Sequence, residues 1–236
     1  MKQLSKARII FYHLYPGLII TAGFIVLAPL AIKKGFPPQA GMLIAVLLFG
    51  LPALLLHLYK EKTRERRSSL AALNGFTKKL PKWKLIVYCL ILVLIAFLIW
   101  GITQPVNKII TEKLFGWLPA WYTVQDLKGY SPDALKITLV LNLIINGLLA
   151  PIAEELYFRG YLLSRMNVFG KYAVIVNTLL FSFYHFWQPY IYFTLIFALL
   201  PMIYMVRKTK SLQLATWTHC VLNCIGAILS FGLLAK

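Results

Sequence analysis

The sequence is poor in charged residues and in cysteine, and each shortage excludes a class of protein. Only 14% of the 236 residues are charged and 60% are hydrophobic. In soluble domains about 25% of the residues are charged and about 45–50% are apolar. This composition therefore excludes an ordinary soluble domain and a disordered chain. The three cysteines lie in apolar runs without a CxxC spacing, which argues against a disulfide framework and a thiolate metal site.

Acidic residues are scarce relative to basic ones: seven stand against 25 Lys and Arg, for a net charge of +18. Such an excess can indicate nucleic-acid binding. In so apolar a chain, without a nucleic-acid motif, it is typical of a membrane protein with cationic cytoplasmic loops. We expect the lipid bilayer as a partner and no nucleic acid. Five acids lie in loops or at interfaces, whereas Glu154 and Glu155 are adjacent in an apolar stretch.

Apolar runs that can cross a bilayer, which takes about 20 residues, recur along the chain. They predict an all-α fold, a polytopic membrane bundle of about seven to eight transmembrane helices. The seven predicted spans are 9–32, 39–59, 85–103, 136–166, 172–188, 190–206 and 211–234. An eighth is expected if part of 105–122 re-enters the membrane.

Basic residues predict the orientation of these spans. The segment 60–84 holds nine Lys and Arg, and the N-terminus is also basic. The positive-inside bias places both in the cytoplasm, and the 104–135 loop is then external. We interpret 60–84 as a solvated surface that binds lipid headgroups. The chain is expected to be one integral membrane domain, with N-terminal helices in 1–135 and a functional helical core in 136–236.

The helix predicted over 136–166 carries the adjacent acids. Glu155 and Arg159 are four residues apart, so they share a helix face and form an ion pair. Glu154 lies about 140° around the helix from Arg159, at 100° per residue, and points elsewhere. Pro151 lacks an N–H and frees the carbonyl of Gly147, which often kinks a membrane helix beside a functional site.

Three further polar residues reach the same depth from other helices. His219 and Asn223 are four residues apart and face one cavity, and His185 ends the span predicted over 172–188. Counted from the inner helix ends at 1.5 Å per residue, these groups and Glu154 lie roughly 12–21 Å deep. Ionisable groups are costly at that depth and usually functional.

Two chemistries suit this set. Glu154 can take a proton from water as a general base, a histidine can protonate a leaving amine, and Asn223 can donate to an oxyanion. No GxSxG or HExxH motif offers another route. Alternatively, Glu154, His185 and His219 form a two-His-one-carboxylate zinc site with an open position for water. No cofactor is assigned, and zinc is the candidate if a metal is present.

The ordered motifs EExxxR (Glu154–Arg159), FxxxH (Phe181–His185) and HxxxN (His219–Asn223) resemble those of the CAAX protease and bacteriocin-processing family. This family, also called CPBP or Abi, includes the type II CAAX prenyl endopeptidases, and the resemblance covers about 136–234. It implies an intramembrane endopeptidase that acts on a membrane-associated protein or peptide, in a bacterial or archaeal cell membrane. The first glutamate and both histidines are then essential. Family members are described both as metalloproteases and as metal-free glutamate proteases, and the sequence leaves that choice open.

Two other functions remain as alternatives. One is a non-catalytic immunity or scaffold protein that binds a membrane peptide. The other is a proton-coupled transporter, which ranks last because no pair of broken helices recurs in corresponding halves. The other polar residues in the spans are given structural roles: His13 and His57 as interfacial groups, and Asn142, Asn146 and Asn177 as interhelical hydrogen-bonding groups.

Overall fold

The computed structural model describes residues 2–124 and 126–232, and in these two ranges the regular structure is helical. The N-terminal half contains α1 (Lys6–Lys33), α2 (Pro38–Ala45), η1 (Val46–Gly50), α3 (Leu51–Arg64), η2 (Ala71–Leu73), α4 (Lys82–Lys113) and η3 (Ala120–Tyr122). The C-terminal half begins with one long rod made of α5 (Pro132–Leu141), η4 (Asn142–Leu149), α6 (Ala150–Glu154), η5 (Glu155–Leu162) and η6 (Leu163–Arg165). It continues with η7 (Asn167–Tyr172), α7 (Ala173–Tyr184), η8 (Pro189–Ile191), α8 (Tyr192–Thr209) and α9 (Leu212–Gly232).

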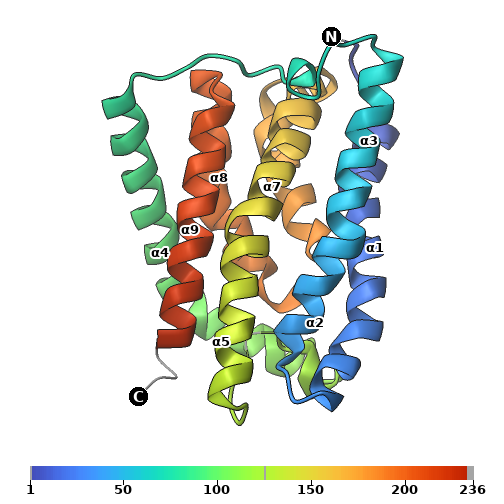
Figure 1. The fold of residues 1–236 in the computed structure, drawn as a ribbon. Coiled ribbons are helices and arrows are strands. Elements are labelled where there is room, and N and C mark those ends of the chain that lie inside the picture. Colours follow the sequence, from blue (N-terminus) through green and yellow to red (C-terminus); the bar gives the residue numbers. More distant parts are fainter. Residues whose placement is uncertain (1, 125, 233–236) are drawn as a thin grey trace.

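These helices form a bundle whose members run roughly side by side (Figure 1). Six helices are long and apolar enough to cross a bilayer: 6–33, 38–64, 82–113, 132–165, 189–209 and 212–232. The predicted helical membrane bundle is confirmed. Much of its apolar surface faces outward, for example Leu94 at 68% exposure and Ile102 at 68%, as expected where lipid replaces water as the solvent.

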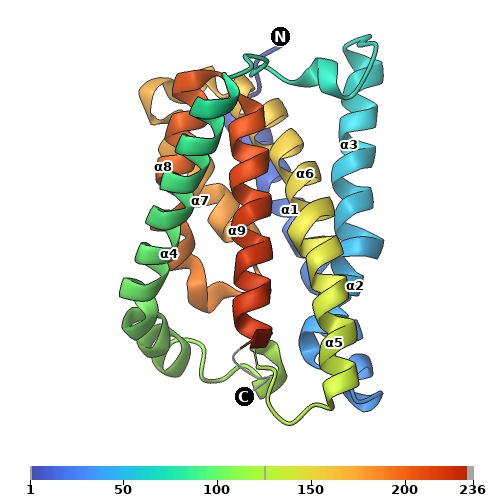
Figure 2. The same cartoon turned by 60° about the vertical axis from the view of Figure 1, so that its left-hand side comes forward.

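The span predicted over 172–188 is wrong in its length. The helix there, α7, has only 12 residues, or about 18 Å at 1.5 Å per residue, against about 30 Å of hydrocarbon. It ends at Tyr184, and Pro189 follows soon after. The turn from α7 to α8 stops short of the lower ends of α5 and α9 in two views (Figure 1, Figure 2). The chain therefore turns back inside the bundle, which brings His185 into its interior.

The optional eighth span in 105–122 is absent from the described residues. The first part of that segment continues α4 to Lys113, with Pro105 inside the helix. The last part is the single short turn η3. Neither is among the six helices long enough to cross.

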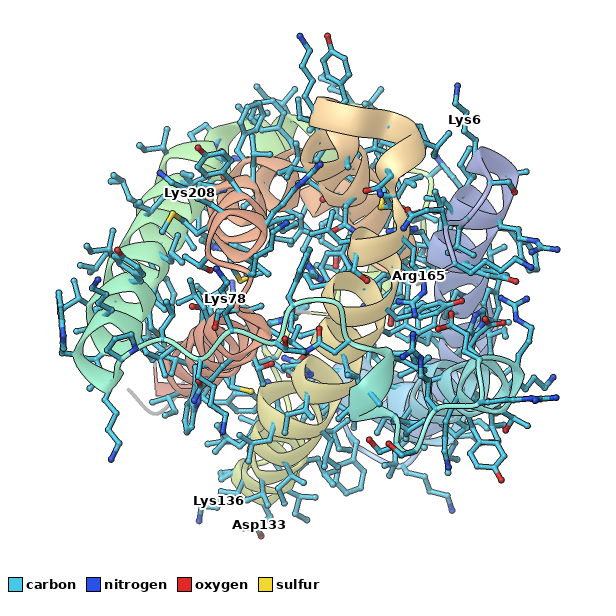
Figure 3. The ribbon with its side chains drawn as sticks, turned by 90° about the horizontal axis from the view of Figure 1, so that it is seen from above. Lys6, Lys78, Asp133, Lys136, Arg165 and Lys208 are labelled. Atoms are coloured by element: carbon cyan, nitrogen blue, oxygen red, sulfur yellow. The ribbon has the colours of Figure 1, made fainter. Side chains whose placement is uncertain are left out.

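The basic segments gather at one end of the bundle, as the predicted topology requires. The N-terminus and the connection from α3 to α4 lie together at the upper end of Figure 1. Seen from that end, Lys6, Lys78 and Lys208 come from α1, this connection and α8 (Figure 3). The assignment of this end to the cytoplasm stays a prediction, and so does the division at residue 135.

The connection between α3 and α4 is more tightly packed than a solvated loop. Leu73 and Phe76 are buried, and the stretch 68–77 around them contains no basic residue. Gly75 N donates to Gly160 O at 3.0 Å, and Leu212 N donates to Phe76 O at 3.1 Å. The segment 71–78 therefore straps the rod to α9 across the basic end.

Arg165 fixes this strap from below. Its guanidinium is fully buried. It donates to both carboxylate oxygens of Glu65 at 3.0–3.2 Å and to Leu73 O at 2.9 Å. Burial raises the pKa of Glu65, but the hydrogen bonds and charge of Arg165 outweigh burial and, with those of Arg67, hold this pKa below its ordinary value. Arg165 therefore joins the rod to the strap through the Leu73 carbonyl and to the end of α3 through the ionised carboxylate of Glu65.

The interpretation of His13 as an interfacial residue is wrong. Its side chain is fully buried, with Nδ1 donating to Ile9 O at 2.7 Å and Nε2 accepting from Asn177 Nδ2 at 2.9 Å. Asn177 also donates to Phe158 O at 3.1 Å, so it links helices as predicted. The sequence concealed this because His13 and Asn177 are 164 residues apart.

Candidate active site

The two adjacent glutamates lie where the rod changes its helical geometry. Glu154 ends α6, and Glu155 begins η5, a wider helix of the π type. Such wide turns occur often at functional sites, because they rotate successive side chains out of the ordinary helical register. Both carboxylates are buried, at 7% and 0% exposure, so each needs a partner inside the bundle.

Glu155 is the centre of a buried ionic group. Its Oε1 lies 3.1 Å from Arg159 Nη1, the predicted ion pair, and 2.8 Å from His219 Nδ1. Because a carboxylate only accepts, Nδ1 of His219 carries a proton, and in the neutral imidazole Nε2 then has the free lone pair. The Arg159 guanidinium also lies 3.8 Å from the centre of the Phe181 ring, a cation–π contact. Glu155 therefore orients His219 and balances the charge of Arg159.

Glu154 points away from Arg159, as predicted, and toward two other helices. Its Oε1 accepts a hydrogen bond from the Tyr184 hydroxyl at 3.1 Å. Its Oε2 lies 3.9 Å from His219 Nε2, which is too long for a hydrogen bond. Two acceptors at this spacing can share one water, about 2.8 Å from each. The Glu154–His219 pair is thus the place where a water could be activated.

His185 is the first residue after α7 and satisfies that helix end. Its Nδ1 donates to Phe181 O at 2.9 Å, one of the carbonyls that a helix end leaves unpaired. The ring packs against Phe181, Tyr184 and Trp187, with centroids 4.9–5.0 Å apart. Because Nδ1 donates to Phe181 O, Nε2 is the unprotonated nitrogen of the neutral ring. The Phe181 ring beside His185 also lies 6.3 Å from the His219 ring.

Asn223 lies one turn beyond His219 on α9 and contacts the same rod. Its Nδ2 donates to Asn146 O at 2.8 Å. In a π-type helix, residue i binds the carbonyl of i−5, so Pro151 leaves the carbonyl of Asn146 unpaired rather than that of Gly147. The freed carbonyl is the one that Asn223 binds. The pair joins α9 to the rod, and Asn146 has the interhelical role predicted for it.

The zinc alternative can be tested against this arrangement. Both histidines have Nδ1 engaged and Nε2 available, which is how ligating histidines are held. However, no three His, Cys, Asp or Glu side chains of the described chain are grouped to hold a metal ion. The described residues are therefore not grouped as a metal centre, and the proposed mechanism is written without a metal.

Tyr184 was not predicted from the sequence, but it is as much a part of this site as the motif residues. It is nearly fully buried and contacts Glu154 directly. Position 17 explains part of its placement, because a Cβ there would overlap the Tyr184 carbonyl. Only glycine lets α1 approach α7 so closely. The signal was available in the sequence, since Tyr184 immediately precedes His185.

Comparison with known families agrees with the motifs. Residues 136–225 match the family model described as type II CAAX prenyl endopeptidase Rce1-like. No curated protein and no solved structure matches the chain. The matched segment runs from α5 through most of α9, so it contains every residue that forms the buried site. Residues 136–225 of this integral membrane protein are therefore similar to the Rce1-like type II CAAX prenyl endopeptidases.

Proposed function

We propose that this protein is an intramembrane endopeptidase in which Glu154 and His219 activate a water for attack on a peptide bond. The observation that carries this proposal is the 3.9 Å separation between Glu154 Oε2 and His219 Nε2. Both atoms accept hydrogen bonds, and each is held by a further partner: Tyr184 for Glu154, and Glu155 for His219. The family match over this segment supports a protease activity.

In the proposed reaction, Glu154 takes a proton from the water as the water oxygen bonds to the peptide carbonyl carbon. The tetrahedral intermediate carries the negative charge on the former carbonyl oxygen. When it collapses, the C–N bond breaks and the amine receives the proton that Glu154 took up. A general base of this kind supplies about 10²–10⁴-fold in rate.

The remaining motif residues have supporting roles in this scheme. Glu155 holds His219 in the tautomer with an unprotonated Nε2, and Arg159 balances the charge of Glu155. His185 lines the site beside Phe181. Asn223 Nδ2 donates to Asn146 O at 2.8 Å and, more weakly, to Asn146 Oδ1 at 3.4 Å. As the proposed oxyanion donor it gives up the longer of these two contacts.

The position of the site favours a substrate that reaches it from the membrane. His219 borders a small cavity between α4, α8 and α9, in which its neighbours include Ala96, Ala198 and Leu222. The cavity is only water-sized, at about 10 Å³, but its apolar walls favour an apolar neighbour over a charged one. The proposed substrate class is a membrane-associated protein or peptide.

Replacing Tyr184 by phenylalanine should slow cleavage without unfolding the protein. The Tyr184→Phe variant loses the hydrogen bond to Glu154, and bonds to charged groups contribute about 1.5–3 kcal/mol. We expect kcat/KM for a membrane peptide to fall at least about tenfold. Tyr157→Phe is the matched control, since that hydroxyl donates to Tyr12 O on α1 instead. Equal losses in both variants would contradict a specific role for Tyr184.

Chelation distinguishes the metal-free scheme from a zinc protease. We expect the purified protein to contain less than one zinc per chain and to keep its cleavage rate in excess chelator, because the ligand atoms of the described residues are not grouped for a metal. The measurement is elemental analysis of the purified protein alongside the cleavage assay. Stoichiometric zinc, with activity lost in chelator and restored by zinc alone, would replace this mechanism with metal-assisted hydrolysis.

A further inference from the structure

An apolar groove lies at the end of the bundle opposite the basic strap, far from the candidate active site. The lower ends of α1, α2 and α5 meet there (Figure 1, Figure 2). Its volume is about 330 Å³. Every lining residue except Lys34 is apolar, and the lining includes Ala31, Ile44 and Ile137. The groove opens outward, since Leu30 and Ile137 on its walls are 54% and 49% exposed.

The membrane setting restricts what can fill this groove. A volume of this size corresponds to about ten water molecules, which would have apolar walls on every side but one. Water there would lack polar groups to hydrogen-bond, whereas a hydrocarbon chain gives up no hydrogen bond when it enters the groove. The groove runs along α1 from Leu27 to Lys34, about 10 Å along the helix axis. This length and shape suit part of an acyl chain lying against the protein.

Lys34 gives the groove a polar end. It directly follows α1, is exposed and lines the groove. The described structure gives it no ion-pair partner. The end of a membrane helix lies at headgroup depth, where a lysine ammonium attracts a phosphate by about 1 kcal/mol when the lipid is anionic.

We propose that this groove binds one anionic phospholipid, with an acyl chain between α1, α2 and α5 and the headgroup at Lys34. The proposal is independent of the protease activity, because the groove shares no residue with the site around Glu154. Lys33 offers a matched control. It precedes Lys34 and has the same charge at the same helix end, but it is outside the groove lining.

Native mass spectrometry of the full chain in detergent tests the proposal, with phosphatidylglycerol and phosphatidylcholine added separately. We expect one phosphatidylglycerol per chain, bound about fivefold more tightly than phosphatidylcholine, as one lysine at a lipid surface supplies. Lys34→Ala should remove that preference and keep the weaker binding, whereas Lys33→Ala should bind as the unchanged protein does. Ala31→Phe fills the groove beside Lys34 and should abolish binding of both lipids.

Two results would overturn the proposal. If Lys33→Ala and Lys34→Ala reduced the preference equally, the attraction would belong to the basic helix end and not to a site. If Ala31→Phe retained the bound lipid, the chain would lie elsewhere on the surface. Helical circular dichroism of each variant verifies that lost binding is not lost folding, and Leu94→Phe, on the exposed face of α4, controls for an added ring.

Discussion

Replacing Glu154 by glutamine is expected to abolish cleavage of a membrane peptide, with kcat/KM falling by about 10²–10⁴-fold. The physical reason is that the amide cannot take a proton from water, so the contribution of the general base is lost. The shape is preserved, and the Gln oxygen still accepts from the Tyr184 hydroxyl that now binds Glu154 Oε1. The protein should therefore insert and unfold as before. The assay is cleavage by protein reconstituted in vesicles.

Glu112→Gln is the control for this substitution. Glu112 lies on α4 with its side chain 57% exposed, where it pairs loosely with Lys108. The same chemical change there should leave the cleavage rate unaltered. Cleavage at the original rate by the Glu154→Gln protein would contradict the assignment of Glu154 as the general base.

The same variant separates the protease from the non-catalytic alternative. An immunity or scaffold protein would bind its membrane peptide equally well with Gln at position 154 or with Ala at position 219. A protease would keep binding but lose the products. Measuring bound peptide and released products on the same samples therefore distinguishes the two functions. A transporter would show flux across the vesicle membrane, which neither of the other functions requires.

Much of this site was predictable because helical spacing is a local property. The pair Glu155–Arg159 follows from an i,i+4 spacing that survives in the wide helix. The common depth of Glu154 and His219 follows from counting residues along helices of known rise, and the two side chains do meet. Both inferences need only one helix at a time and the assumption that helices cross one membrane.

The features that were missed depend on contacts between distant segments or on local departures from the α-helix. The contact of His13 with Asn177 joins α1 to α7, and nothing near either residue signals it. The carbonyl freed by Pro151 belongs to Asn146 because the turn before it is of the π type, which the apolar pattern does not reveal. The shortness of α7 was hidden because its apolar pattern continues through Phe186 and Trp187 after the helix has ended.

Removing Arg159 is expected to cause the largest loss of stability. In Arg159→Met, a side chain of moderate length fills the space but Glu155 stays buried without its cation. Breaking one half of a buried ion pair costs about 3–5 kcal/mol, so the free energy of unfolding should fall by that amount. Chemical unfolding in mixed micelles, followed by tryptophan fluorescence, measures the change.

The double variant Glu155→Gln/Arg159→Met tests whether the loss arises from the unpaired charge. With both charges removed, most of the stability should return, because no ion is left buried alone and the Gln oxygen can still accept from His219 Nδ1. If the two single losses simply added, the ion pair would not be the cause. Cleavage should stay impaired even in the stable double variant, because a neutral amide holds the imidazole more weakly than a carboxylate does. Recovery of folding without recovery of rate is therefore the result expected if the buried pair serves to position His219.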